Sequence, residues 1–267
     1  MSTVPAGAPA ARHRQAAVVA WVVAVAFAVT IAVLVLGAST SAPAVVDPVA
    51  RLVDVEAVAP PPRPPAPAPS GAPGPPPQPA PDPVWVADVA ARTGIPARAL
   101  VAYAEADLRA QAELPGCAVS WATLAGIGDV ESRHGTIGGR ALSDDGRPVS
   151  TPIIGVALSG AGPVAHVADS DAGRLDGDAT YDRAVGPMQF IPQTWRRWGA
   201  DGDGDGRSDP QDVDDATWSA ARYLCASGGR LDSPDGWRRA VLSYNPSGSY
   251  VLDVLSATNA YAARSRP

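Results

Sequence analysis

Residues 117–135 read CAVSWATLAGIGDVESRHG, and we interpret the rest of the chain around this stretch. Apolar and small residues recur in it at the period of an α-helix, so it predicts one helix over residues 117–133. At about 100° per residue, one edge of the helical wheel carries Cys117, Trp121, Leu124 and Gly128. Glu131 lies on the same edge, so the apolar stripe ends in a carboxylate.

The position of Glu131 predicts a general acid. A carboxylate among apolar side chains is poorly solvated, which raises its pKa toward the range that acid catalysis needs near neutral pH. Glycines at positions 126, 128 and 135 leave room for another group to approach the helix. The alternative is that Glu131 is a solvated residue at the end of the helix, next to Arg133.

The composition excludes one class of partner. The chain has 267 residues, a formal net charge of −6 and 29 prolines. An acidic balance of charge argues against nucleic acid as a partner. Because so many prolines cannot all lie in helices, part of the chain is expected not to fold.

Residues 16–37 are predicted to form one transmembrane helix. They carry no charged side chain, and a run of about 21 helical residues spans roughly 31 Å, enough for the hydrocarbon core of a bilayer. Arg12 and Arg14 precede the run, and no lysine or arginine follows it until Arg51. The positive-inside rule therefore makes residues 1–15 a cytoplasmic tail, and we expect a single-pass protein of the cell membrane with an extracytoplasmic C-terminal domain.

A cleaved signal peptide is the alternative, because residues 41–44, Ser-Ala-Pro-Ala, have the small size that cleavage requires. The apolar run is longer than the core of a signal peptide, typically about 7–15 residues, which favours an uncleaved anchor. Protease treatment of spheroplasts tests the anchor, because an anchored outer domain is degraded. A protected domain, or release of a mature protein that lacks residues 1–44, would contradict it.

Residues 38–83 are predicted to be a disordered linker rich in proline and alanine. Such a composition favours extended polyproline II and offers too few large apolar residues for a core. At about 3.1 Å per residue, the linker reaches on the order of 100 Å from the membrane. Residues 84–267 then form one folded domain, long enough for a single core.

Cys117 and Cys225 are the only cysteines of the chain. Both follow the membrane segment and so lie in an oxidising compartment, where one disulfide between them is expected. The alternative is that each is a separately buried free thiol.

The remaining folded segments are predicted to be mostly α-helical. Proline and glycine bound stretches of helical period, predicted over residues 85–92, 97–114, 192–198, 215–226, 236–244 and 249–263. Residues 136–180 are rich in Gly, Ser and Asp, and their one apolar run, 151–158, is consistent with a strand. A loop of this length is usually functional or mobile.

Residues 201–215 read DGDGDGRSDPQDVDD and match the first half of an EF-hand calcium loop. Oxygen ligands are expected from three side chains and one backbone carbonyl, those of Asp201, Asp203, Asp205 and Arg207. The twelfth position is Asp212, which is one methylene shorter than the usual glutamate, so Asp215 is a second candidate to close the loop. We expect a structural Ca²⁺ here, and the alternative is a solvated acidic turn.

Five residues are candidates for binding a sugar. Met188 and Gln189 lie in irregular backbone before a predicted helix, and Tyr244, Asn245 and Tyr250 lie at the junction between the last two predicted helices. Amide side chains can hydrogen-bond sugar hydroxyls, and aromatic rings can stack on sugar rings. The alternatives are that Gln189 bonds to nearby backbone groups and that the tyrosines belong to the core.

Four short motifs follow one another along the chain: Val130-Glu131-Ser132…Gly135, Gly186-Pro187-Met188-Gln189-Phe190-Ile191-Pro192, Ala221-Arg222-Tyr223-Leu224 and Ser243-Tyr244-Asn245…Tyr250. Each is weak alone, but their order, with an EF-hand-like loop between the second and third, is a specific signal. In this the chain resembles the lytic transglycosylases of peptidoglycan, most closely the membrane-bound type B branch of actinobacteria. The resemblance covers roughly residues 85–262.

The resemblance implies a lysozyme-like, mostly helical fold and a set of functional positions. It implies that Glu131 is the single catalytic acid/base, with Ser132 beside it as a substrate-binding residue. The saccharide-binding positions of the family fall on Gln189, Tyr244 and Asn245. Its calcium loop is slightly longer than an EF-hand loop, which favours Asp215 over Asp212 as the closing ligand.

The reaction that the resemblance implies is cleavage of the MurNAc–GlcNAc β-1,4 bond with formation of a 1,6-anhydro sugar. One carboxylate suffices, because the substrate's own 6-hydroxyl is the nucleophile. A lysozyme-type muramidase is the first alternative, but it needs a second carboxylate about 5–10 Å away. Asp129 points about 200° round the helix from Glu131, which leaves Asp182 as the candidate. The second alternative is a non-catalytic, calcium-stabilised module that binds the cell wall.

Overall fold

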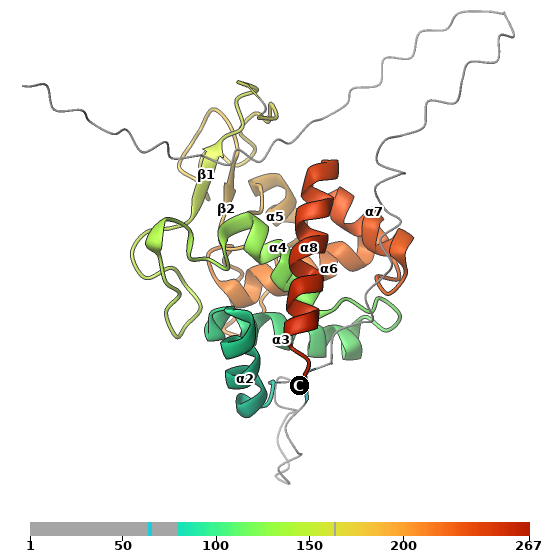
Figure 1. Ribbon diagram of the computed structural model, residues 1–267. Helices are drawn as coiled ribbons and strands as arrows, with labels where there is room; N and C mark the ends of the chain where they lie inside the picture. Colours follow the sequence, from blue (N-terminus) through green and yellow to red (C-terminus); the bar gives the residue numbers. More distant parts are fainter. Residues whose placement is uncertain (1–63, 66–79, 163) are drawn as a thin grey trace, which may run out of the picture.

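The computed structural model describes residues 64–65, 80–162 and 164–267. The predicted tail and transmembrane segment, residues 1–37, lie outside this part of the chain, as does most of the predicted linker. Within the described residues, none of the helices has the length and hydropathy that a bilayer crossing requires. The described domain is mostly helical, as predicted (Figure 1).

All the helices predicted within residues 84–267 are present. They are α2 (Pro83–Thr93), α3 (Ala97–Glu113), α4 (Trp121–Ser132), α5 (Pro192–Trp198), α6 (Val213–Gly228), α7 (Pro234–Tyr244) and α8 (Gly248–Arg264), with a short 3₁₀ helix at Ile137–Gly139. Side chains that cap free backbone N–H groups define several N-termini. Asp82 caps α2, Ser233 caps α7 and Ser247 caps α8.

The start of α4 differs from the prediction, because the helix begins at Trp121 and not at residue 117. Ser120 is its N-cap and accepts a hydrogen bond from the Thr123 N–H at 3.2 Å. Asp107 of α3 accepts a second one, from the Trp121 N–H at 2.9 Å. Cys117 therefore lies in the irregular segment before the helix, and its placement on the helical wheel was wrong.

Helix α4 is the central helix, and it packs against α8, α3 and α6 (Figure 1). Its apolar side chains Trp121, Leu124 and Ile127 are fully buried. Gly126 lets α8 approach closely, since an added Cβ would lie 2.9 Å from the Val254 carbonyl oxygen and would also meet the Thr258 side chain. The glycines of α4 thus make room for protein neighbours and not for a ligand.

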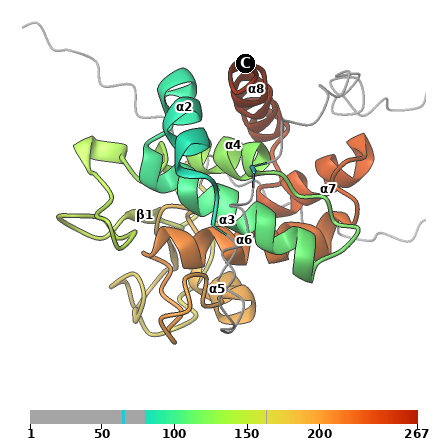
Figure 2. The same ribbon diagram turned by 90° about the horizontal axis from the view of Figure 1, so that it is seen from below.

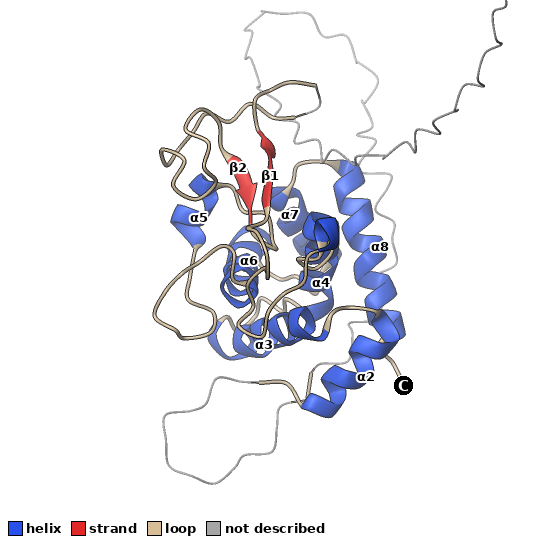
Figure 3. Ribbon diagram, turned by 90° about the vertical axis from the view of Figure 1, so that its left-hand side faces the viewer, coloured by secondary structure: helices blue, strands red, loops and turns tan. Residues whose placement is uncertain are grey.

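The other helices surround α4. Seen from below, α3 lies against α6 (Figure 2). Two short antiparallel strands, β1 (Ile154–Ala157) and β2 (Arg183–Val185), stand at one end of the helical body (Figure 3). The strand predicted within residues 151–158 is confirmed.

The connection between the strands is organised by aspartates. Asp169, Asp171 and Asp178 each accept hydrogen bonds from backbone N–H groups two to four residues further along the chain. Asp176 accepts another, from the Arg183 N–H at 2.6 Å. These local bonds give a long loop a defined path without helices or a core of its own.

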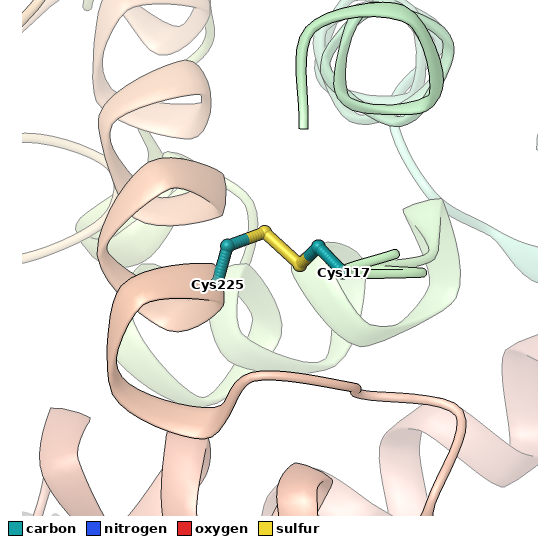
Figure 4. Close-up of a disulfide and its surroundings, with 2 residues drawn as sticks. All are labelled: Cys117 and Cys225. Atoms are coloured by element: carbon teal, nitrogen blue, oxygen red, sulfur yellow. A yellow bond between two sulfur atoms is a disulfide. The ribbon is translucent and has the colours of Figure 1, made fainter. Parts of the chain in front are cut away.

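The predicted disulfide is confirmed. Cys117 is joined to Cys225 of α6 across a sequence separation of 108 residues (Figure 4). The bond attaches the segment before α4 to the last third of α6, next to the Leu231 N–H, which donates to the Cys117 carbonyl at 2.7 Å. The segment that leads into α4 is therefore linked covalently to α6.

Replacing both cysteines, Cys117→Ser with Cys225→Ser, should lower the free energy of unfolding by about 4–5 kcal/mol. The reason is that a cross-link enclosing about 108 residues restricts the unfolded chain. Urea denaturation of the wild-type and double-variant proteins measures the change. Dithiothreitol should destabilise the wild type and leave the double variant unaffected. A reduced wild type that unfolds at the same urea concentration as the oxidised one would contradict the prediction.

Candidate functional site

Glu131 lies one residue before the end of α4. The chain turns away directly after the helix, because Arg133, His134 and Gly135 all have positive φ angles, of 53°, 59° and 80°. The His134 N–H donates to the Gly128 carbonyl at 2.8 Å and closes the last turn. Two non-glycine residues in this conformation are strained, so the surrounding contacts must hold the turn.

The carboxyl of Glu131 has one close polar contact, with Tyr250 of α8. The Tyr250 hydroxyl donates to Glu131 Oε1 at 2.6 Å. Burial among protein atoms raises the pKa of Glu131 to about 7, and the hydrogen bond from Tyr250 opposes the rise. The residue nevertheless keeps part of its surface open to solvent. The carboxyl is thus protonated in a large fraction of molecules near neutral pH, as the sequence predicts.

Ser132 joins the end of α4 to the Gly186-Pro187-Met188-Gln189 segment. Its hydroxyl donates to the Pro187 carbonyl at 2.6 Å and accepts from the Gly135 N–H at 2.7 Å. The side chain is buried. Ser132 therefore positions the turn beside Glu131, and its hydroxyl is not exposed to a ligand.

Met188 and Gln189 lie in irregular backbone before α5. The side chain of Met188 is fully buried, and its carbonyl accepts from the Tyr244 hydroxyl at 2.7 Å. Gln189 has a positive φ of 49°, and its amide donates to the Gly186 carbonyl at 3.0 Å. The local backbone contact considered for Gln189 is thus present, and the Tyr244 bond draws the segment toward α7.

Tyr250 and Asn245 are buried, so Tyr250 follows the alternative that the tyrosines belong to the core. The cause is the 2.6 Å bond to Glu131, which holds the Tyr250 ring inside. Asn245 Oδ1 is buried and has no hydrogen-bond partner among the described residues. A buried acceptor without a partner is costly, so this position carries a polar atom that the fold alone does not satisfy.

A hydrogen-bonded network on the side of α4 away from Glu131 was not predicted from the sequence. Tyr261 donates to Asp129 Oδ2 at 2.8 Å, and its oxygen lies 2.9 Å from His134 Nε2. His134 Nδ1 lies 3.2 Å from the hydroxyl of Tyr103. Because the Tyr261 proton goes to Asp129, Nε2–H donates to Tyr261 and Nδ1 accepts from Tyr103. Burial lowers the pKa of His134 to about 4, which keeps the ring neutral.

The sequence carried no local signal for this network. His134 and Tyr103 are 31 residues apart, and His134 and Tyr261 are 127 apart. Contacts between residues so far apart in the sequence leave no periodic pattern that sequence analysis could detect. They anchor the strained turn that follows Glu131.

The two other carboxylates considered for catalysis are engaged elsewhere. Asp129 accepts from Tyr261, on the side of α4 away from Glu131. Asp182 is fully buried and accepts from both the N–H and the hydroxyl of Ser170, at 2.8 Å each. The pKa of Glu131 is set by burial and by Tyr250, without a contribution from either carboxylate.

The acidic loop brings together part of the predicted metal set. Asp201, Asp203 and Asp215 each place a carboxylate oxygen within 4.8 Å of the others. Asp205 lies outside this group, 3.6 Å from Arg147. Asp215 is fixed by the Gly202 N–H at 2.6 Å and by the Asp209 N–H at 2.7 Å.

The remaining candidates for the metal site are Asp212 and Arg207. Asp212 is the N-cap of α6 and belongs to a second acidic group, with Asp203 and Asp214. Arg207 donates its N–H to Asp205 Oδ1 at 2.8 Å. Three carboxylates with oxygen atoms this close suit a hard cation such as Ca²⁺.

Replacing Tyr250 by phenylalanine should raise the pKa of Glu131 further, above about 7. The hydrogen bond stabilises the charged carboxylate, so its loss favours the protonated form. A ¹³C NMR titration of the Glu131 carboxyl measures this. Tyr223→Phe is the matched control, because that hydroxyl donates to the Ser243 carbonyl and not to Glu131. A lower or unchanged pKa in Tyr250→Phe would contradict the assignment.

The comparisons with known proteins agree with the motifs. Residues 164–242 match the family model described as Transglycosylase SLT domain. No curated protein matches the chain. Among solved structures it is similar to the Escherichia coli lytic transglycosylase Slt35 in complex with bulgecin A, at 16% identity, covering 69% of this chain and 76% of that one, with a TM-score of 0.42.

Two further solved structures are similar to the chain. SltB3 from Pseudomonas aeruginosa in complex with NAG-anhNAM-pentapeptide has 22% identity, covers 69% of this chain and 65% of that one, and gives a TM-score of 0.41. Slt35 in complex with calcium has 17% identity, 69% and 77% coverage and a TM-score of 0.40. Residues 164–242 of the chain are therefore similar to the transglycosylase SLT domain.

Proposed function

We propose that the domain cleaves the MurNAc–GlcNAc β-1,4 bond of peptidoglycan without water and forms 1,6-anhydroMurNAc, with Glu131 as the only acid/base. The observation that carries the proposal is the half-buried Glu131 carboxyl at the end of α4, with its pKa raised to about 7. A group with this pKa can both donate and accept a proton near neutral pH.

In the first step, protonated Glu131 donates its proton to the glycosidic oxygen. The bond between that oxygen and C1 of MurNAc breaks, and positive charge develops on the sugar ring. Glu131 is now a carboxylate, and the Tyr250 hydroxyl at 2.6 Å stabilises its charge. GlcNAc leaves with the proton as its new 4-hydroxyl.

In the second step, the 6-hydroxyl of the same MurNAc attacks C1. The Glu131 carboxylate accepts the proton of that hydroxyl and returns to its starting state. No water is consumed, and no second carboxylate takes part. The engagement of Asp129 and Asp182 in other bonds supports this route over a two-carboxylate hydrolase.

The saccharide contacts are proposed at Gln189, Tyr244 and Asn245, around the segment that Ser132 and Tyr244 hold against α4. The unpartnered Oδ1 of Asn245 supports a polar ligand near this point. Met188, Ser132 and Tyr250 are proposed to act by positioning, because their side chains are buried.

A structural Ca²⁺ is proposed in the acidic loop. Asp201, Asp203 and Asp215 would hold it, with Asp205 and the Arg207 carbonyl as further donors. The close carboxylates support this, because they repel one another without a cation. The ion would stabilise the loop that leads into α6 and takes no part in proton transfer.

The domain is proposed to act outside the cytoplasm, held to the membrane by residues 16–37 and separated from it by the linker of residues 38–83. The run without charge and the basic residues before it support this arrangement. A linker reaching on the order of 100 Å would let one anchored enzyme work over an area of the wall.

Glu131→Gln should fold, bind glycan and lose turnover by at least ~10²–10⁴-fold, since the amide cannot give up a proton. Burial raises the Glu131 pKa from 4.5 to about 7, so ionisation removes stability as pH rises through this range. The variant should therefore be at least as stable as wild type at pH 8. Muropeptide release from purified sacculi measures turnover, and thermal melting at pH 5 and pH 8 measures stability. Full activity of the variant would remove Glu131 from the mechanism.

The products of the wild-type enzyme distinguish the two chemistries. Transglycosylation should give 1,6-anhydro ends, about 18 Da lighter than hydrolysed ends because one water is not added. Mass spectrometry of the digest resolves the two. Reducing ends would keep Glu131 as the acid and make the enzyme a muramidase, whereas binding without any release would make the domain a wall-binding module.

Calcium should raise the melting temperature by about 5–10 °C at a free concentration about 100-fold above Kd, because the ion binds only the folded loop. Melting curves with calcium and with chelator measure the shift. Asp203→Asn should reduce it, whereas Asp171→Asn, in the separate acidic group of residues 169, 171 and 182, should retain it. Equal melting temperatures with calcium and with chelator would argue against the site.

A further inference from the structure

Arg147 places a positive charge against the acidic loop that is proposed to hold Ca²⁺. It lies in the turn of residues 142–148, which precedes β1. Its guanidinium nitrogens lie 3.1 Å from Asp212 Oδ2, 3.3 Å from Asp209 Oδ2 and 3.6 Å from Asp205 Oδ2. One side chain thus contacts three carboxylates of the loop, and the mechanism above gives it no role.

The carboxylates of the loop divide into two sets. Asp201, Asp203 and Asp215, the group proposed to hold the ion, take part in no ion pair among the described residues. Asp205, which the calcium pattern assigns to the same group, lies against Arg147 instead. Arg147 therefore holds the one predicted side-chain ligand that is missing from the group.

Both oxygens of Asp205 are engaged away from the group. Oδ1 accepts from the Arg207 N–H at 2.8 Å, and Oδ2 pairs with Arg147. The Asp205 N–H, in contrast, donates to Asp203 Oδ1 at 2.9 Å. The backbone of Asp205 thus adjoins the proposed cation group, while its carboxylate is turned toward the arginine.

The contact with Asp212 anchors the arginine. Asp212 is fully buried, and its Oδ2 has no hydrogen-bond partner among the described residues. The guanidinium 3.1 Å away therefore supplies the opposite charge that a buried carboxylate needs. The turn itself is fixed to the start of α6, because the Gly146 carbonyl accepts from the Val213 N–H at 3.1 Å. Arg147 therefore stays at Asp212 when its other contacts change.

The contact with Asp205 is the one that can open. It is the longest of the three, and it leaves 30% of the Arg147 side chain and 36% of the Asp205 side chain exposed. Ion pairs exposed to this degree are weak, because water and salt screen them. A carboxylate oxygen that binds Ca²⁺ directly lies about 2.3–2.6 Å from the ion, a much closer contact. A bound ion would therefore draw Asp205 away from Arg147.

We propose that Arg147 competes with Ca²⁺ for the carboxylate of Asp205. Without the ion, Arg147 neutralises Asp205 and the loop keeps its folded form. With the ion, Asp205 joins the other ligands and Arg147 remains at Asp212. The competition weakens calcium binding, so the loop fills only at higher concentrations of the ion than its carboxylates alone would need. The inference rests on the calcium site of the proposed function.

The test is a calorimetric titration of the chelator-stripped, full-length chain with Ca²⁺, which does not depend on turnover. In Arg147→Lys, the ammonium keeps the charge and pairs with Asp212, but it has no planar fork with which to contact Asp205 as well. The variant should bind Ca²⁺ about 2- to 5-fold more tightly than wild type, since the ion no longer has to displace an exposed ion pair. Arg183→Lys is the matched control and should keep the wild-type affinity, because Arg183 pairs with Asp178, outside the loop.

A double-variant cycle shows whether Arg147 acts through Asp205. Asp205→Ala removes both the calcium ligand and the partner of Arg147, so it should weaken calcium binding. Adding Arg147→Lys to Asp205→Ala should then leave the dissociation constant unchanged, because the contact that couples the two positions is already lost.

Two results would overturn the proposal while leaving the calcium site in place. One is an equal affinity of wild type and Arg147→Lys for Ca²⁺, and the other is a tightening by Arg147→Lys that persists in the Asp205→Ala chain. Absence of calcium binding in both wild type and Arg147→Lys would overturn the calcium site, and this inference with it. The glycan chemistry is measured separately, from the 1,6-anhydro ends of the wild-type digest, so it can hold or fail independently of the loop.

Discussion

The close approach of α4 and α8 at Gly126 is the constraint on which the site depends. Because Gly126 has no Cβ, the backbone of α8 at Val254 can approach α4 closely. This close contact fixes how the two helices lie against each other. That geometry places Tyr250 beside Glu131 at one end of the seam and Tyr261 beside Asp129 further along it. The raised pKa of Glu131 follows from this packing, since the same contact buries the carboxyl and supplies its hydrogen bond.

The turn after Glu131 shows how the fold holds a strained segment in place. Arg133 and His134, two successive non-glycine residues in the left-handed region, need compensation from their surroundings. On one side, the Ser132 hydroxyl stabilises the turn by donating to the Pro187 carbonyl. On the other, the neutral ring of His134 stabilises it through hydrogen bonds with Tyr103 and Tyr261. A histidine that stays uncharged down to about pH 4 keeps this support across the range in which Glu131 titrates.

Sequence patterns predicted the features that depend on residues close together in the chain or on general properties of its compartment. The helices, the strand within residues 151–158, the disulfide and the raised pKa of Glu131 follow from period, breakers, compartment and apolar surroundings. The start of α4 was missed because the Ser120 cap overrides an apolar spacing that continues to Cys117. The burial of Tyr250, the separation of Asp205 from the other loop carboxylates and the His134 network depend on partners far along the chain, which no local pattern reveals.

The hydrogen bond to Glu131 comes from a residue 119 positions further along the chain. At a synthesis rate of about 5–20 residues per second, Tyr250 is made roughly 6–24 s after Glu131. Until α8 exists, α4 lacks its principal neighbour, and the carboxyl is a solvated side chain with an ordinary pKa. The raised pKa of Glu131 therefore arises only when the last helix docks, after nearly the whole domain has been synthesised.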